Sequence, residues 1–389
     1  MDIDELRLQI DTLDRQLVDL LVARSRVTAE IGAFKRERGL ALYVPERELE
    51  LLNARREQAQ AAGADPDMVE DVLRRVMRGS YASQETALPA VVDARAPVVV
   101  LGGRGAMGRL MVSLFERADY PVRVIDVDNI DDLPNAVVDA GLVMVSVPID
   151  STAQVIAALP KLPQHCVLCD ITSVKQMPLD AMLAAHSGPV VGLHPMFGPD
   201  VKSLVKQVIV VCHGREPARY DWLLRQLEAW GGLLREESPA AHDQAMQMIQ
   251  AMRHFTTIAY GVFLSRQPAD LERLLRLSSP IYRLELAMVG RLFAQSPTLY
   301  ADIMLQAEHL PELISDYRHA LDELLALVRN DDRDGLITRF RDVQGYFGDL
   351  APKLLKESAE LLRKMHDAQG GKAEHRGLET APTKDAPSR

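Results

Sequence analysis

The sequence predicts a protein of several domains: an all-α domain of three helices, an α/β domain with a doubly wound parallel sheet, and a second all-α domain. Three observations favour this division. The chain has 389 residues, against roughly 150 in an ordinary domain. Apolar residues recur every three or four positions near both ends, whereas β-branched runs alternate with helix-length segments between them. The composition, 47% apolar and 26% charged, is that of a globular chain and excludes a disordered one.

The first domain, residues 1–90, begins with a long helix over residues 3–34. Its apolar residues form a coiled-coil-like seam at Ile3, Leu6, Ile10, Leu13, Leu17, Leu20, Val27, Ile31 and Phe34. Two short neighbours cannot cover so long a seam, so we expect a partner helix, which a second chain can supply. A second helix is predicted over residues 46–62. A third follows over residues 67–87, with Asp65 as its N-cap and Pro66 in its first turn.

A connector over residues 91–97 leads to the α/β domain, residues 98–215. Its expected parallel strands are the β-branched runs at residues 98–101, 122–125, 142–147, 167–171, 190–193 and 208–211. Amphipathic stretches then replace these runs, and we predict a helical domain over residues 216–366. Residues 367–389 contain a single leucine and no aromatic residue, which predicts a disordered tail.

Charge and cysteine content exclude several classes of function. A net charge of −10 argues against nucleic-acid or membrane partners. The acidic start lacks the pattern of an export signal and no apolar run approaches ~20 residues, so we expect a cytoplasmic protein. Three cysteines do not form a disulfide framework. Cys166 and Cys169 form a C-x-x-C within an apolar run, where we expect buried strand residues and no metal site.

A dinucleotide site is predicted where the first strand meets the next helix. Gly103, Gly105 and Gly108 have the G-x-G-x-x-G spacing, with Met107 inside it. Small residues there let a pyrophosphate approach the N–H groups of a helix N-terminus. Asp126 ends the second strand, where its carboxylate can bind a ribose 2′-hydroxyl and would repel a 2′-phosphate. We therefore predict NAD rather than NADP.

Polar residues follow the later strands, and ligands bind at the carboxyl ends of such strands. Ser146 and Pro148 are expected to line the nicotinamide half of the crevice, although Pro148 equally fits a helix start. Ser173 and Lys175 follow the fourth strand. His194, at the end of the fifth, is a candidate acid or base, with a structural role as the alternative.

With the motif Gly-Gly-x-Gly-x-Met-Gly and the stretch 278–294, these segments resemble the prephenate dehydrogenases. The resemblance implies hydride transfer from prephenate to NAD with loss of CO₂. It implies that His194 accepts the proton of the 4-hydroxyl group, that Ser173 holds this geometry, and that Arg291 binds the ring carboxylate. Arg283 and Lys175 are left open between substrate binding and a structural role. His254 is a candidate sensor of tyrosine, with a structural role as the alternative.

One residue of the first helix breaks the seam. Arg24 stands four residues after Leu20, where an apolar residue is expected, so it should meet an anion or set the helix register. Lys35, eleven residues on, lies within ~20° of Arg24 around the helix, whereas Arg7 is rotated by ~100°. Arg7 is thus poorly placed for the same pocket. Taken singly, Arg7 and Lys35 would be ordinary solvated charges.

The first ninety residues resemble the all-helical chorismate mutases, whose two chains interleave, and the order of domains resembles the bifunctional chorismate mutase/prephenate dehydrogenases. The resemblance implies that Arg7 and Arg24 clamp carboxylates and that Lys35 and Gln84 donate to the ether oxygen. Three more residues are implied to complete the pocket: Arg47, Glu48 and Ser80. Some relatives carry an aspartate where this chain has Val44. Some carry a carboxylic acid at position 84, whereas the Gln84 amide donates at any pH.

The resulting hypothesis is a homodimeric bifunctional enzyme of tyrosine biosynthesis that is inhibited by tyrosine. Two alternatives stay open. The dehydrogenase could prefer arogenate, or the front helices could be a non-catalytic dimerising or regulatory module. Against the second stands the joint presence of the charged pocket residues, since a plain coiled-coil seam has no use for Arg24.

Overall fold

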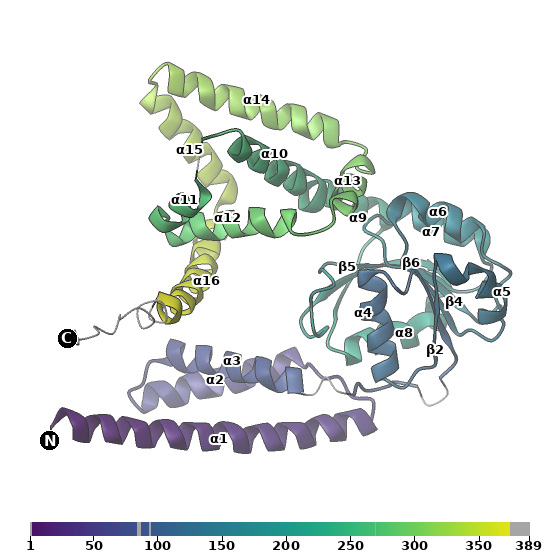
Figure 1. Ribbon diagram of the computed structural model, residues 1–389, viewed down its shortest axis with the longest axis horizontal. Coiled ribbons are helices and arrows are strands. Elements are labelled where there is room, and N and C mark those ends of the chain that lie inside the picture. The colour runs from purple at the N-terminus through teal and green to yellow at the C-terminus, as the bar shows by residue number, and fades with distance from the viewer. Residues whose placement is uncertain (1, 84–86, 93–94, 269, 374–389) are drawn as a thin grey trace, which may run out of the picture. The chain divides into compact units, whose positions relative to one another are not determined.

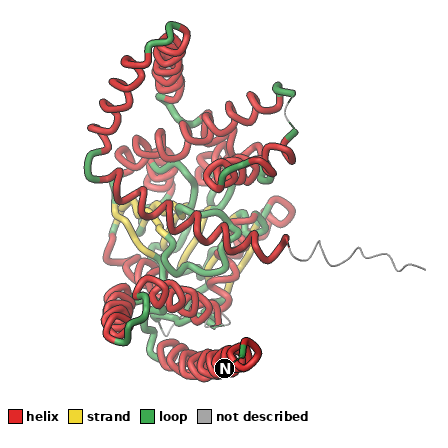
Figure 2. Tube along the Cα trace, turned by 90° about the vertical axis from the view of Figure 1, so that its left-hand side faces the viewer, coloured by secondary structure: helices red, strands yellow, loops and turns green. Residues whose placement is uncertain are grey.

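A computed structural model describes residues 2–83, 87–92, 95–268 and 270–373 (Figures 1 and 2). Contacts group the chain into two compact units, Met1–Ala245 and Met246–Arg389. The predicted helical front domain and α/β domain both belong to the first unit. The three-part fold class predicted from the sequence is confirmed.

The front domain consists of α1 (Ile3–Glu37), α2 (Pro45–Ala61) and α3 (Pro66–Ser83). Asp2 caps α1 by accepting the backbone N–H groups of Asp4 and Glu5. Asp65 accepts the N–H of Asp67 at 2.9 Å, as predicted for an N-cap. Helices α2 and α3 lie side by side above α1 in Figure 1. The end predicted for the third helix, with Gln84, lies outside the described residues.

The α/β domain has one sheet of seven strands in the order β2-β1-β3-β4-β5-β6-β7. The strands are β1 Val98–Leu101, β2 Val122–Ile125, β3 Leu142–Val145, β4 Val167–Asp170, β5 Val190–Pro195, β6 Val208–Arg215 and β7 Leu233–Glu236. The first five strands are parallel, as predicted.

The sheet departs from the prediction in two ways. Strand β6 runs antiparallel to β5, because a connection without a helix lets the chain turn back beside the strand it has left. Strand β7 pairs parallel with β6, so the predicted domain end at residue 215 is too early. This edge strand has only two apolar residues, Leu233 and Leu234, before Arg235 and Glu236, which makes its sequence pattern weak.

Helices cover both faces of the sheet. One face carries α4 (Ala106–Arg117) and α8 (Pro217–Ala229). Phe115 of α4 is buried there among the inward side chains of the strands, and Trp222 of α8 packs against the same core. The other carries α5 (Leu133–Ala136), α6 (Ile149–Ala157) and α7 (Gln176–Ala185), after the short helix η1 (Val127–Asp132). Leu42 and Leu88 of the front domain join the first of these cores.

The described residues of the second unit form helices joined by loops and turns, without a strand. Helix α9 (Pro239–Met246) leads into it, and the π-helical segment η2 (Gln247–Met252) begins it. The helices that follow are α10 Arg253–Ser265, α11 Leu271–Leu277, α12 Pro280–Phe293, α13 Pro297–Leu305, α14 Leu310–Arg329, α15 Arg333–Phe347 and α16 Leu350–Ala373. The predicted tail therefore begins too early, since residues 367–373 are helical. Residues 374–389 lie outside the described part.

Two kinds of feature are absent from the described residues. No helix there is long and apolar enough to cross a membrane. No group of three or more His, Cys, Asp or Glu residues is placed there to hold a metal ion. Cys166 and Cys169 are fully buried and unpaired, as expected for residues at a strand.

Candidate active sites

The glycine motif forms a tight turn between β1 and α4. Gly102 ends the strand at φ +75°, and a Cβ on Gly108 would lie 2.2 Å from the Gly102 carbonyl oxygen. Helix α4 therefore packs against the turn at a distance that only glycine permits. Gly105 is the N-cap of α4 and makes no side-chain capping bond, which leaves N–H groups of the first turn for an anion. This is the geometry that the predicted pyrophosphate site requires.

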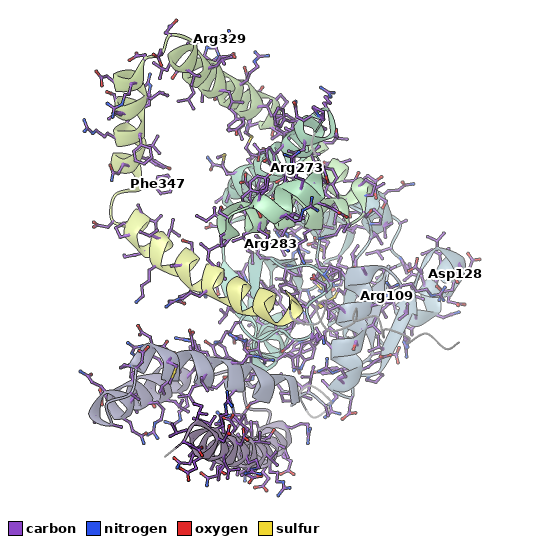
Figure 3. All side chains as sticks on the ribbon, turned by 60° about the vertical axis from the view of Figure 1, so that its left-hand side comes forward. Arg109, Asp128, Arg273, Arg283, Arg329 and Phe347 are labelled. Carbon is purple, nitrogen blue, oxygen red and sulfur yellow. The ribbon has the colours of Figure 1, made fainter. Side chains whose placement is uncertain are left out.

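Asp126 stands at the end of β2, in the position expected of a ribose ligand. Its two carboxylate oxygens accept the N–H groups of Arg104 at 3.1 Å and Val127 at 3.0 Å. Arg104 also pairs with Asp128, which is labelled in Figure 3 together with Arg109 of α4. The backbone thus holds the Asp126 carboxylate beside the glycine turn, where each oxygen keeps a lone pair for a ribose hydroxyl.

The third strand end is built from backbone contacts. The N–H of Ser146 donates to the Leu101 carbonyl at 2.8 Å, which ties this strand end to the glycine turn. Pro148 is the N-cap of α6, and its carbonyl accepts the Thr152 hydroxyl at 2.9 Å. The helix-start role that the sequence left open for Pro148 is therefore present, and the residue is exposed.

His194 is the buried centre of a chain of hydrogen bonds. Its side chain lies on β5, and the residue is 3% exposed. Nδ1 of His194 lies 2.8 Å from Nε2 of His242, and Nδ1 of His242 lies 2.7 Å from the Asp243 carboxylate. That carboxylate also accepts the backbone N–H groups of Lys175 and Gln176, at 2.8 and 2.9 Å.

This chain of hydrogen bonds sets the tautomer of His194. The Asp243 carboxylate can only accept, so Nδ1 of His242 carries a hydrogen and its Nε2 accepts one from Nδ1 of His194. Nε2 of His194 is then the nitrogen with the lone pair. Burial raises the pKa of Asp243, but its hydrogen bonds with His242 and the two N–H groups prevail and lower it.

Lys175 completes the electrostatics of this site. Its ammonium is fully buried, pairs with Asp170 and donates to the Leu193 carbonyl at 2.8 Å. Burial, and then the positive charge of Lys175, hold the pKa of His194 well below its ordinary value. The imidazole is therefore neutral near pH 7 and able to accept a proton. Ser173 lies half-buried in the loop after β4, the strand beside β5.

Sequence reasoning missed two members of this site, His242 and Asp243. They lie on α9, 48 residues beyond His194, and the only signal was an adjacent His-Asp pair after the last strand. A His-Asp pair is common enough that its spacing alone predicts nothing. The contact forms because α9 returns to the end of β5.

The second unit holds the other predicted dehydrogenase residues. Arg283 (labelled in Figure 3) donates to the Leu275 carbonyl at 3.4 Å and so supports the end of α11. Arg291 is exposed in the last turn of α12. His254 is buried, with its ring 4.6 Å from that of Tyr300. Burial, and then the neighbouring Arg253, lowers the pKa of His254 to about 4.

The front domain brings several predicted mutase residues together. Arg24 donates to the Ser80 hydroxyl at 2.7 Å, so the seam-breaking arginine meets a polar group of α3. Lys35 donates to the Leu42 carbonyl at 3.0 Å, and burial lowers its pKa. The ring of Tyr43, the next residue, packs edge-on against Tyr81 at 5.9 Å.

Glu48 is the most enclosed carboxylate of the front domain, with a side chain that is 5% exposed. It accepts the Tyr81 hydroxyl at 3.2 Å and lies 3.4 Å from Arg74. Its third partner is Lys206, from the connection between β5 and β6. Sequence reasoning missed Lys206 and Tyr81, because neither belongs to a recognisable motif. We call Arg24, Lys35, Glu48, Ser80 and Tyr81 the mutase cluster.

The remaining predicted mutase residues lie apart from this cluster. Arg7 pairs with Asp4 and Arg47 pairs with Glu50, and both arginine side chains are more than 70% exposed. Val44 precedes α2 as its N-cap, where its side chain makes no capping bond. The described chain thus brings together only some of the predicted polar groups, and Arg7 faces outward from α1.

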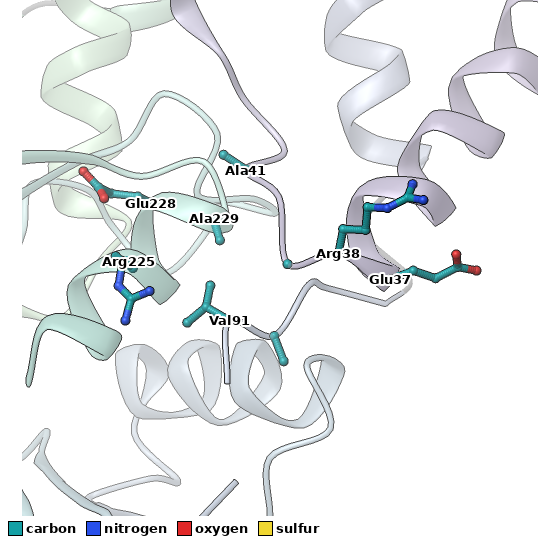
Figure 4. Close-up of a pocket in the computed structure, with 9 residues that line it drawn as sticks. Glu37, Arg38, Ala41, Val91, Arg225, Glu228 and Ala229 are labelled. Atoms are coloured by element: carbon teal, nitrogen blue, oxygen red, sulfur yellow. The ribbon is translucent and has the colours of Figure 1, made fainter. Parts of the chain in front are cut away.

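A pocket of 530 Å³ lies where the end of α1 and the connector meet α8 (Figure 4). None of the predicted site residues lines it. The lining residues are Glu37, Arg38, Gly39, Ala41, Ala90, Val91, Arg225, Glu228 and Ala229.

Three protein families match successive parts of the chain. Chorismate mutase type II matches residues 6–85, the prephenate dehydrogenase nucleotide-binding domain matches residues 117–230, and the prephenate dehydrogenase dimerization domain matches residues 238–342. The T-protein of Enterobacter agglomerans is 49% identical over 369 residues, which cover 95% of this chain and 99% of that relative. The chain belongs to the T-protein family. A second T-protein, from Haemophilus influenzae, is 44% identical over 94% of this chain and 98% of its own length.

Membership of the T-protein family establishes the activities. The chain is a bifunctional enzyme of tyrosine biosynthesis, a chorismate mutase joined to an NAD-dependent prephenate dehydrogenase. The solved prephenate dehydrogenase from A. aeolicus, in complex with hydroxyphenyl propionate and NAD+, shares the fold. It superimposes with a TM-score of 0.50 at 16% identity and covers 65% of this chain and 97% of its own. The family predicted from the sequence is confirmed.

Proposed function

We propose that the two reactions use separate sites, with the mutase cluster serving the first and the strand ends around His194 serving the second. The observation that carries this assignment is the chain of hydrogen bonds from Asp243 through His242 to His194. It leaves one neutral nitrogen with a lone pair among the strand ends of a dinucleotide-binding sheet. A purely structural histidine has no need of such an arrangement.

In the second reaction, NAD, when bound, would supply the acceptor for the hydride that leaves C4 of prephenate. The residues we expect to hold it are Gly103, Gly105, Met107, Gly108, Asp126, Ser146 and Pro148. Nε2 of His194 takes the proton of the 4-hydroxyl group as that carbon becomes a carbonyl, while the ring carboxylate leaves as CO₂. His242 and Asp243 then stabilise the imidazolium that forms. Ser173 orients the hydroxyl group, and Arg291 binds a carboxylate through its planar fork.

In the first reaction, chorismate rearranges to prephenate without an acid, a base or a metal. The protein has to hold the reactive conformer and stabilise the negative charge that develops on the ether oxygen. We assign Arg24 to a substrate carboxylate and Lys35 and Gln84 to the ether oxygen. Glu48, Ser80 and Arg47 complete the pocket. The partly buried ammonium of Lys35 is a stronger donor than a fully hydrated one.

We propose that the working form is a homodimer in which α1 packs against the partner's α1. The nine apolar side chains of its seam are 43–67% exposed in the single chain. Burying such a stripe is strongly favourable, and a second copy of α1 offers the same stripe. Arg7 would then reach the partner's mutase cluster. Replacing Leu13 and Leu17 by glutamate should yield monomers in sedimentation that lack mutase activity, and a mutase-active monomer would contradict the proposal.

We further propose that tyrosine inhibits the dehydrogenase and that His254 takes part in the response. Its imidazole is buried and neutral against the ring of Tyr300, next to the π-helical segment η2. Inhibition of NADH formation by tyrosine should weaken in His254→Asn, and unchanged inhibition would exclude this role. We also propose a cytoplasmic location, because all three cysteines are buried thiols, as in a reducing compartment.

One experiment tests the two-site assignment. The purified protein is incubated with chorismate, first without NAD and then with it. Prephenate should accumulate in the first case, and 4-hydroxyphenylpyruvate with NADH in the second. Supplying arogenate with NAD in a parallel reaction tests the alternative substrate, and faster NADH formation from arogenate would overturn the preference for prephenate. Absence of prephenate in the first incubation would mean that the front helices are a non-catalytic module.

A further inference from the structure

Lys206 occupies an unusual backbone conformation at the end of the connection between β5 and β6. Its φ is +66°, in the left-handed region that side chains other than glycine and asparagine rarely adopt. Its N–H donates to the Gly231 carbonyl at 2.9 Å, which holds this conformation. Strain of this kind persists only where the surroundings impose it.

The Lys206 side chain leaves its own domain and reaches the mutase cluster. Its ammonium pairs with the Glu48 carboxylate and lies 5.1 Å from the centre of the Tyr43 ring. Glu48 is 5% exposed, whereas the Lys206 side chain is 40% exposed. The other cation near Glu48, Arg74, lies 3.4 Å away and also pairs with Glu70. Lys206 is therefore the closer cationic partner of an almost buried carboxylate.

Two hydrogen bonds show that this contact is part of a built junction. The N–H of Leu42 donates to the Ala229 carbonyl at the end of α8, and the Leu42 carbonyl accepts Lys35 of the mutase cluster. Leu42 is itself buried in the core of the α/β domain. The α/β domain is thus linked to the mutase cluster at two places. The link to Lys35 is indirect, through Ala229 and the front-domain residue Leu42, whereas Lys206 contacts Glu48 directly.

We propose that Lys206 is a positioning residue of the mutase, contributed by the dehydrogenase domain. It holds the Glu48 carboxylate in one orientation at the mutase cluster, where a desolvated carboxylate without a close cation would be unfavourable. The proposal rests on the proposed place of Glu48 in the mutase pocket. It gives the fused domains a chemical reason to stay joined, because the first site is incomplete without a side chain of the second domain.

The test measures both activities in four variants of the full-length enzyme. Lys206→Met keeps the aliphatic stem and removes the charge, and Lys206→Arg restores a cation. Lys202→Met removes a charge from an exposed position of the same connection and is the matched control. Glu48→Gln tests the carboxylate itself. Mutase activity is followed with chorismate alone, and dehydrogenase activity with supplied prephenate and NAD.

We expect Lys206→Met to lower mutase kcat/KM by about ten-fold, the effect of losing one charged hydrogen bond. Lys206→Arg should recover most of this loss, and Lys202→Met should match the unchanged enzyme. Dehydrogenase activity should stay within about two-fold in all of them. We also expect the double variant that combines Lys206→Met with Glu48→Gln to lose less mutase activity than the product of the two single losses, because both substitutions remove the same interaction.

Three results would overturn the proposal. Normal mutase activity in Lys206→Met beside an impaired Glu48→Gln would show that Lys206 is not used. Parallel loss of both activities, with no recovery in Lys206→Arg, would show that it only holds the domains together. Normal mutase activity in Glu48→Gln would instead refute the proposed place of Glu48. If Lys206→Met fails to fold, Lys206→Gly removes the side chain and relieves the positive φ, and the same outcomes apply.

Discussion

Gly108→Ala is the sharpest test of the dinucleotide site. The added Cβ would lie 2.2 Å from the Gly102 carbonyl oxygen and 2.8 Å from the Gly103 Cα. Ordinary contact begins at 3.4 Å, so the first turn of α4 must move by 3.4 − 2.2, or 1.2 Å, away from the glycine turn. Both obstructing atoms belong to the backbone and cannot rotate away. Overpacking of this kind costs roughly 1–3 kcal/mol of stability.

The displacement should act mainly on the dehydrogenase. A shift of about 1 Å in groups that position a reactant lowers rates by about 100-fold, so we expect a loss of that order in kcat/KM for NAD with saturating prephenate. Mutase activity with chorismate should remain within about two-fold, because the mutase cluster contains no part of α4. Gly345→Ala is the control, since its Cβ would meet nothing within 4 Å and alanine favours a helix. Unchanged NAD affinity in a folded Gly108→Ala enzyme would refute the role of the glycine turn.

Four further predictions concern single side chains. His194→Asn should abolish NADH formation yet keep prephenate production, and Arg24→Ala should do the reverse when prephenate is supplied; loss of both activities in both folded variants would rule out two sites. Asp126→Ala should raise kcat/KM for NADP relative to NAD, and an unaltered ratio would exclude its contact with the ribose. Gln84→Glu should confine mutase activity to acid pH, because a carboxylic acid donates only when protonated; an unchanged pH profile would contradict its role. His254 has a folded pKa of about 4, below the ~6.5 of an unfolded chain, so its contribution to stability is full above pH 6.5 and is lost as the pH falls toward 4. The urea midpoint should therefore fall less steeply over this range in His254→Leu than in the unchanged enzyme.

Local patterns predicted most of the elements. The helix predicted over residues 3–34 is observed as Ile3–Glu37, and the strand runs at residues 98–101 and 122–125 match β1 and β2 in full. These predictions succeeded because helix and strand periodicity depend on neighbouring residues. The direction of β6 could not be predicted in this way, since a β-branched run has the same pattern in either direction.

The site residues also differ in whether their contacts are local or distant along the chain. The glycine turn and Asp126 lie within one βαβ unit, so their spacing along the chain already implied their geometry. His242 and Asp243 pair with a strand 48 residues away, and Lys206 pairs with a carboxylate 158 residues away. No local spacing encodes such contacts. The roles assigned to Arg7 and Arg47 stay predictions, because both side chains face outward in the single chain.

The sequence by itself determined the three domains, the dinucleotide turn and the histidine that we propose as the proton acceptor, because each depends on residues that are neighbours along the chain. Only the tertiary structure decided which tautomer His194 adopts, where the sheet ends and which domain supplies the cation beside Glu48. The physical reason is that hydrogen bonds and ion pairs act over about 3 Å in space, whatever the separation in sequence. Side chains from distant segments become partners only when the packed core brings them to the same place.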